Sequence, residues 1–201
     1  MSLPVELNFV RVFVENQQVP LLFVSDGQIN FILPTNLKPG PVTIRVATEG
    51  LSGPEIQVNV VNCAPTMFPT DGGFALATDA QNQVLTPDHP AYPGDIVVIY
   101  MTGLGRTSPS FDAREVPGTA ARIVSTIKVS LGGQDLDPVY TKYAGLTPGW
   151  PGLYQLNLEI PKNAGTDPEL KVTGDVSASG LKLPIRMKIA QSEQPSVGDP
   201  R

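Results

Sequence analysis

The stretch Gln28-Ile29-Asn30-Phe31-Ile32-Leu33-Pro34 decides the fold, because it returns later as Gln155-Leu156-Asn157-Leu158-Glu159-Ile160-Pro161. Both copies read glutamine, aliphatic, asparagine, apolar, any residue, aliphatic, proline. Polar and apolar residues that alternate with a period of two are typical of a β-strand with one buried face. The repetition therefore predicts that the chain contains two copies of one β-rich unit.

The residues on either side extend the match. Upstream, an apolar residue at every second position (Val10, Val12, Val14) precedes Glu15-Asn16-Gln17-Gln18-Val19, and Ile127, Val129 and Leu131 precede Gly132-Gly133-Gln134-Asp135-Leu136 in the same phase. Downstream, Ile56, Val58 and Val60 correspond to Leu183, Ile185 and Met187. We expect a first unit over residues 1–62, a second over residues 63–190, and a polar tail over residues 191–201 that frays.

Short apolar runs separated by Gly, Pro, Asn and Asp predict an all-β sandwich with no helix longer than about two turns. Strands are expected at Val5–Val14, Leu21–Val24, Gln28–Leu33, Val42–Ala47, Glu55–Val61, Phe74–Thr78, Asp95–Thr102, Ile123–Leu131, Val139–Tyr143, Leu153–Ile160, Leu170–Gly174 and Leu183–Ile189. The first unit has no counterpart of the hairpin that begins at Phe74 or of the strand Ile96–Thr102. This difference predicts a truncated first sandwich.

Composition excludes several classes of function. The 201 residues carry a net charge of −5 with no basic cluster, so a nucleic-acid-binding surface is not expected. The single cysteine, Cys63, excludes an intrachain disulfide and every metal motif with several cysteines, and it is expected to be a small buried or linker hydrophobe. No apolar run is long enough to span a membrane. Met1-Ser2-Leu3 is not an export signal, which fits a cytosolic protein or one trimmed of its signal.

Candidate catalytic residues are sparse. Asp88, the only histidine His89, and Asp95 form the one cluster with acid and base side chains, but they lie among turn formers and we expect no catalysis there. The run Asp79-Ala80-Gln81-Asn82 lacks the carboxylate density of a calcium loop and predicts a hairpin turn. Gly103-Leu104-Gly105 lacks the third glycine and the helix of a dinucleotide-binding turn. We therefore expect no catalytic residue, no metal and no cofactor.

The candidate binding residues lie in an insertion. The second unit has ten extra residues between its matched strands, accommodated around Ala144–Gly152, and they include the sole tryptophan, Trp150. Together with Tyr143 and Tyr154, Trp150 could form an exposed aromatic platform for a sugar ring. We expect Trp150 instead to pack against its own sandwich or the seam between the units.

The repeated amides are the other recurring polar feature. Gln28 with Asn30, and Gln155 with Asn157, lie on one face of their strands. They could bind a ligand twice, but we expect them to form hydrogen bonds with neighbouring loops and to hold the same corner of each sandwich.

Several blocks resemble a known family. Tyr92–Gly105 and Ala144–Asn157, together with Val24–Asn30, are similar to the uncharacterised C-terminal domain found in many exported acidobacterial proteins. The resemblance spans roughly Val5 to Ile189. It implies a tandem of immunoglobulin-like sandwiches at the end of a larger extracytoplasmic or secreted protein, and it brings no catalytic residue and no ligand.

The functional hypothesis follows from these observations. We expect a non-catalytic extracytoplasmic module for adhesion, spacing or presentation of the N-terminal domains of a larger protein. Its partners would be those domains, or a polysaccharide or surface protein. The alternative is a carbohydrate-binding module that uses the Trp150 loop.

Overall fold

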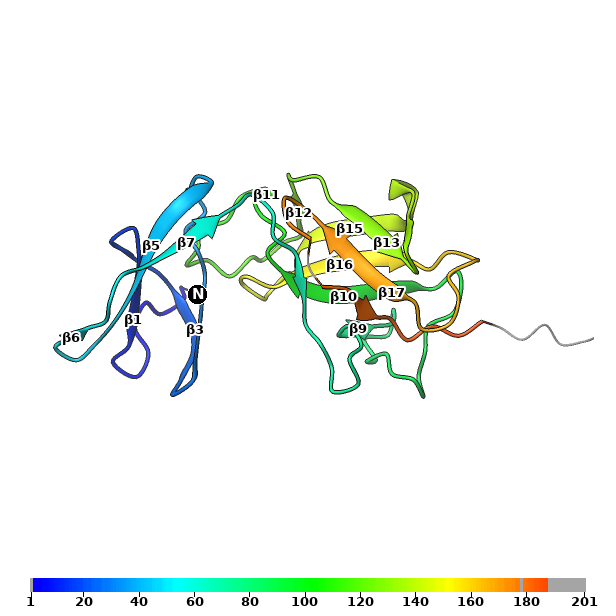
Figure 1. Cartoon of the computed structure of the whole chain (residues 1–201), viewed down its shortest axis with the longest axis horizontal. Coiled ribbons are helices and arrows are strands. Elements are labelled where there is room, and N and C mark those ends of the chain that lie inside the picture. Colours follow the sequence, from blue (N-terminus) through cyan, green and yellow to red (C-terminus); the bar gives the residue numbers. More distant parts are fainter. Residues whose placement is uncertain (1, 178, 188–201) are drawn as a thin grey trace, which may run out of the picture.

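The computed structural model describes residues 2–177 and 179–187, and these residues form two β-rich bodies that lie along the long axis of the molecule (Figure 1). The elements in the described residues are all β-strands except one 3₁₀ turn, Pro138–Tyr140. Asp137 caps this turn, because its carboxylate accepts a hydrogen bond from the Val139 backbone N–H at 2.8 Å. The all-β class predicted from the alternation is confirmed.

The first unit contains one larger sheet and one separate hairpin. The larger sheet has the order β2-β1-β5-β6, and β7 also pairs with β5, whereas β3 and β4 pair with each other. All these ladders are antiparallel. The strands are β1 (Arg11–Val14), β2 (Gln17–Gln18), β3 (Leu21–Ser25), β4 (Gln28–Phe31), β5 (Gly40–Thr48), β6 (Leu51–Ser52) and β7 (Ile56–Val60).

The second unit has two sheets. A seven-stranded sheet has the order β11-β12-β15-β16-β10-β8, with β9 also on β10, and a four-stranded sheet has the order β14-β13-β17-β18. The strands are β8 (Thr66–Met67), β9 (Ala77–Thr78), β10 (Ile96–Thr102), β11 (Thr107–Ser108), β12 (Ala121–Ile123), β13 (Lys128–Leu131), β14 (Gln134–Asp135), β15 (Thr141–Leu146), β16 (Tyr154–Glu159), β17 (Glu169–Thr173) and β18 (Leu181–Lys182).

The larger sheet of the first unit and the four-stranded sheet of the second pair their residues in the same way. Val14 lies opposite Gln17 and Ile44, and Leu131 lies opposite Gln134 and Leu170. The register of the apolar side chains relative to the turn is therefore the same in both sheets.

The hairpins match as well. Gln28 is paired with Ser25 and Gln155 with Gly145, whereas Asn30 is paired with Phe23 and Asn157 with Tyr143. Both ladders then shift register at the next residue, between Leu21 and Phe23 in one and between Thr141 and Tyr143 in the other. The strand pairing thus places Gln28 and Gln155 at equivalent positions. The immunoglobulin-like assignment stays a prediction.

The downstream alignment predicted from the sequence is wrong by two residues. Ile44 pairs with Ile56 and Leu170 with Leu181, so Ile56 corresponds to Leu181 and not to Leu183. A shift of two residues keeps each side chain on its face of the sheet, so the alternation alone could not detect it. Residues 183–187 of the strand expected at Leu183–Ile189 do not form a strand, and β18 ends just before them. Residues 188 and 189 of that expected strand and the predicted tail 191–201 lie outside the described residues.

Other predicted strands are broken by local turns. The strand expected at Val5–Val14 begins only at Arg11, because Asn8 and Phe9 adopt positive φ angles of 48° and 62°. The strand expected at Ile123–Leu131 divides into β12 and β13, which belong to different sheets. The strand expected at Phe74–Thr78 is reduced to β9. The first two residues of the strand expected at Val139–Tyr143 belong to the 3₁₀ turn Pro138–Tyr140.

The two units differ most in their cores. Twenty buried residues form the core of the second unit, and five form that of the first. The five are Val12, Val14, Val19, Leu21 and Val42, and half-buried side chains surround them. The first unit therefore has the strand pairing of the second around a much smaller interior.

Candidate functional site: the joint between the two units

The linker between the units is bonded along its backbone to the second unit. The Asp175 carboxylate accepts hydrogen bonds from the backbone N–H groups of Asn62 (2.8 Å) and Cys63 (3.3 Å). The Asp175 N–H in turn donates to the Cys63 carbonyl oxygen at 2.8 Å, and the Ala64 N–H donates to the Gly103 carbonyl oxygen at 2.8 Å. Charge-assisted bonds to main-chain N–H groups are stronger than neutral ones. The linker is thus fixed to the second unit.

Two glycines make this contact possible. A Cβ atom on Gly103 would lie 2.0 Å from the Ala64 carbonyl oxygen, and one on Gly105 would lie 2.2 Å from that of Asn62. Both residues also have positive φ angles, +78° and +87°, which glycine adopts without strain. The Gly-Leu-Gly motif therefore receives the linker. The sequence analysis considered these glycines only as an incomplete dinucleotide-binding turn, and it did not indicate that they contact residues 62–64.

Cys63 lies buried inside this contact, with 1% of its surface exposed. Burial, followed by the negative charge of Asp175, raises the pKa of its thiol. The thiolate form is disfavoured, which does not suit a nucleophile. Of the two alternatives predicted for Cys63, a small buried hydrophobe or a linker hydrophobe, burial is confirmed.

Three further contacts join the units. The Arg106 guanidinium donates to the Leu37 carbonyl oxygen at 2.7 Å. The Leu3 N–H donates to the Arg114 carbonyl oxygen at 2.9 Å. Gly152 lies so close to the first unit that a Cβ atom on it would be 3.3 Å from Ile32 Cγ1. The linker and these contacts together restrict how the two units can rotate relative to each other.

A cavity of about 720 Å³ opens at this joint. Its walls come from β4 and its following loop, from β5 and β7, and from the near end of the second unit. They include Phe31, Ile44, Val58, Val60, Phe68 and Tyr154. Of the residues that line it, only Arg106 is charged.

The two candidate tyrosines are structural. The Tyr154 hydroxyl donates to the Gly105 carbonyl oxygen at 2.5 Å, and burial raises its pKa to about 12. The Tyr143 hydroxyl lies 2.8 Å from the Leu146 carbonyl oxygen and accepts from the Ala121 N–H at 3.1 Å, with its pKa also raised mainly by burial. Neither hydroxyl is free to contact a ligand together with Trp150.

The packing predicted for Trp150 is wrong, because 64% of this residue is exposed. A tight turn directs it outward. The Trp150 N–H donates to the Thr147 carbonyl oxygen at 3.1 Å, and its carbonyl accepts from the Leu153 N–H at 3.3 Å. Gly149 and Gly152 supply the positive φ angles that this turn requires. Gly152, and not Trp150, reaches the other unit.

The repeated amides bond to each other and not to loops. Gln28 Nε2 donates to Asn30 Oδ1 at 2.7 Å, and Gln155 Nε2 donates to Asn157 Oδ1 at 3.0 Å. The expected loop contacts are therefore wrong. Side chains two residues apart on a strand lie on the same face of the sheet, so each glutamine can donate to the asparagine of its own strand.

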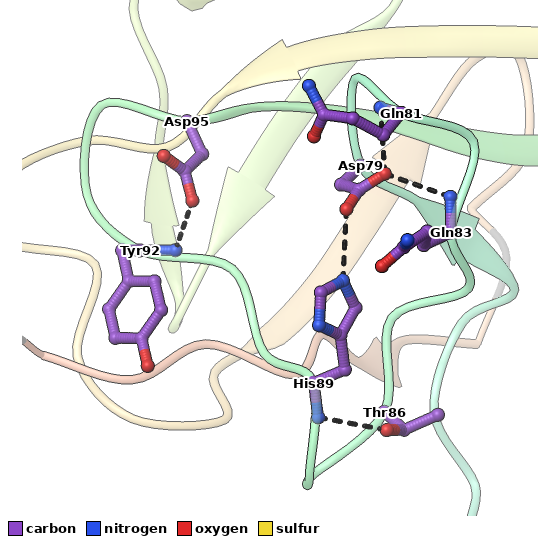
Figure 2. Close-up of polar contacts among 7 residues, drawn as sticks. All are labelled: Asp79, Gln81, Gln83, Thr86, His89, Tyr92 and Asp95. Carbon is purple, nitrogen blue, oxygen red and sulfur yellow. Dashed lines mark hydrogen bonds and ion pairs between the residues drawn. The ribbon is translucent and has the colours of Figure 1, made fainter.

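The acid and base side chains near residue 89 stabilise turns (Figure 2). Asp79 accepts from the backbone N–H groups of Gln81 and Gln83 and lies 2.9 Å from His89 Nε2, and these contacts, led by that with His89, lower its pKa. The Asp95 carboxylate accepts from the Tyr92 N–H at 2.8 Å. His89 therefore pairs with Asp79, and the predicted turn at Asp79–Asn82 is present.

The described residues contain no group of three or more His, Cys, Asp and Glu side chains arranged to hold a metal ion. Within the same residues, no helix has the length and apolar character needed to cross a membrane. No family model matches the sequence, and no curated protein matches it.

Proposed function

We infer that this chain is a non-catalytic module of a larger extracytoplasmic protein, which holds two β-units at a fixed orientation and so spaces or presents neighbouring domains. The observation that carries the proposal is the linker, which Asp175, Gly103 and Gly105 fasten to the second unit through its backbone. Two domains joined by a free linker reorient, whereas a linker bonded along its length transmits orientation.

The side chains near residue 89 support the non-catalytic part. Asp79, His89 and Asp95 are each engaged in turn contacts. The resemblance to the immunoglobulin-like C-terminal domains of exported proteins supports the extracytoplasmic part, with the N-terminal domains of the larger protein, or a surface protein, as partners.

The distance between spin labels tests the fixed orientation. Cysteines introduced at Leu51 and Val139, exposed by 74% and 64%, report on the first and second unit, and Cys63→Ala in every variant leaves only these two thiols to be labelled. We expect one narrow distance distribution that broadens on Asp175→Ala. Gly73→Ala is the control, because Gly73 shares the positive φ angle of the joint glycines but has open space around it. A broad distribution in the parent protein would contradict the spacer role.

Location is tested on cells that carry the native protein. An antibody to this chain should label intact cells, and added protease should remove the label. Recovery of the protein only in the cytosolic fraction would contradict an extracytoplasmic role.

The second candidate function is carbohydrate binding at the Trp150 loop, and the exposure of Trp150 favours it. Aromatic faces present large apolar surfaces to a ligand. Trp150→Ala should leave stability within about 0.5 kcal/mol, because the side chain is outside the core. Loss of binding on a glycan array supports this function if Val124→Ala, at a residue that is 67% exposed, retains binding. Absence of glycan binding by the parent protein would exclude it.

A further inference from the structure

The matched hairpins differ in what lies beside them. β16 lies between β15 and β10 in the seven-stranded sheet, whereas β4, among the described residues, pairs with β3 alone. The position that β10 occupies next to β16 is therefore open next to β4.

The free edge of β4 presents backbone groups for pairing. The Ile32 N–H donates to the Pro20 carbonyl oxygen of the segment before β3, so alternate residues, Ile29 and Phe31, direct their backbone groups to the other edge. In the second unit the backbone groups of alternate residues also point away from β15. Ile160 exchanges hydrogen bonds with Gly94 and Asp95 in the segment before β10, so Leu156 and Leu158 direct their backbone groups to the same edge. An unpaired edge of this kind can accept another strand.

The side chains of β4 lack the cover that those of β16 receive. Leu156 and Leu158 are fully buried, and they lie opposite Ile99 and Val97 of β10, which are also fully buried. Ile29 and Phe31 hold the equivalent positions and are only half-buried against the five-residue core. Apolar surface that is half exposed here is buried in the second unit by one strand.

The cavity coincides with the open position. It is lined by β4 along its length and by Ile44, Val58 and Val60 of the facing sheet. At about 720 Å³ it is larger than the ~300 Å³ of a small ligand pocket. The walls are apolar apart from backbone, amides, the hydroxyls of Thr35, Thr102 and Tyr154, and Arg106, whose guanidinium already bonds to the Leu37 carbonyl oxygen.

We propose that the edge of β4 receives an extended segment of a partner polypeptide as an added antiparallel strand, in the position that β10 holds against β16. The partner segment is uncharged and has an apolar residue at every second position, as Val97, Ile99 and Met101 do in β10. Main-chain hydrogen bonds to Ile29 and Phe31 supply affinity, and the alternate side chains fill the cavity.

The test uses the full chain and a peptide with the uncharged sequence of residues 96–102, to which terminal lysines are added for solubility. Residue-resolved hydrogen exchange should slow about tenfold at the amides of Ile29 and Phe31 when the peptide is added, and less at Asn30, which already faces β3. A peptide with Val97→Asn and Ile99→Asn should bind at least about tenfold more weakly, since it presents polar groups to an apolar cavity. Protection confined to β16 would show strand exchange in the second unit and would overturn the proposal.

Variants of the chain complete the test. Phe31→Asn should weaken peptide binding about tenfold, whereas Leu51→Asn, on a residue that is 74% exposed and outside the cavity, should not change it. The absence of saturable peptide binding by the parent chain would overturn the proposal. A concentration-dependent dimer in sedimentation that the peptide does not dissociate would also overturn it, because the strand would then come from a second copy.

Discussion

The two hairpins carry the same motif with the same pairing, yet only one of them is buried. Leu156 and Leu158 of β16 have no exposed surface, whereas Ile29 and Phe31 of β4 are half-buried. The motif is not the cause of the difference, because the Gln-to-Asn hydrogen bond and the register shift are present in both hairpins. The neighbouring strand β10 is the cause. A repeated sequence thus specifies how a strand pairs locally, and its surroundings determine how much that pairing stabilises the fold.

The largest test of this comparison truncates matched positions. Leu156→Ala should lower the free energy of unfolding by about 3 kcal/mol, because it opens a cavity in a closed core. Ile29→Ala should cost about 1 kcal/mol, because its side chain loses only part of its exposure on folding. Chemical unfolding followed by far-UV circular dichroism measures both. Equal losses would show that the first unit is as well packed as the second.

A second test separates the joint from either unit. Gly103→Ala should cost about 2 kcal/mol or more, since its Cβ would overlap the Ala64 carbonyl and its φ angle would be strained. Gly73 has a φ angle of +73° and open space around it. Gly73→Ala therefore measures the cost of backbone strain without steric overlap, which should be about 1 kcal/mol. Similar losses in the two variants would mean that the linker does not depend on the close approach.

Alkaline pH should weaken the packing around Tyr154 in the second unit, and the first unit has no tyrosine, because all five tyrosines lie beyond residue 63. Burial raises the pKa of Tyr154 to about 12 in the folded protein, and an unfolded tyrosine titrates near ~10. The contribution of Tyr154 to the free energy of unfolding is therefore complete below about pH 10, and it is lost as the pH rises from about 10 towards 12.

Tyr154→Phe should be about 1 kcal/mol less stable at neutral pH, because the hydrogen bond to Gly105 is lost. The difference from the parent protein should shrink above about pH 10. Unfolding curves recorded across this pH range check both points, and a difference that stays constant would contradict the assignment.

The smallest effect is expected at the Asp79–His89 pair. The hydrogen bond to His89 is the leading cause that holds the pKa of Asp79 below its ordinary value. The contribution of this pair to the stability of the folded protein is therefore present above that ordinary value and is lost as the pH falls through the folded pKa. His89→Ala should move the Asp79 pKa upward, as seen by NMR titration of the carboxyl group. The loss of stability at neutral pH should be small, because solvent screens the half-exposed His89 side chain. Asp88→Asn is the control, and an unchanged Asp79 titration in His89→Ala would contradict the prediction.

Alternation and repetition predicted the β-class and the correspondence of Gln28 with Gln155, because both depend on local side-chain periodicity. They could not predict the true partner of Ile56, since a shift of two residues preserves the facing of every side chain. They also could not place Trp150, because its exposure depends on how its turn sits on the fold, where the Gly149 N–H donates to the Pro117 carbonyl oxygen. The joint was missed for a similar reason, because Asp175 and the glycines meet the linker only through the tertiary fold.

The reactivity of the Cys63 thiol can be used to follow the opening of the joint. Cys63 carries the only thiol in the chain, and it lies so tightly under Gly174 that a Cβ atom there would be 2.5 Å from its Sγ atom. A thiol reagent added to the native protein can reach it when the linker separates from the second unit or when that unit unfolds as a whole. An alkylation rate faster than the rate of global unfolding therefore reports how often the joint opens, without any introduced label.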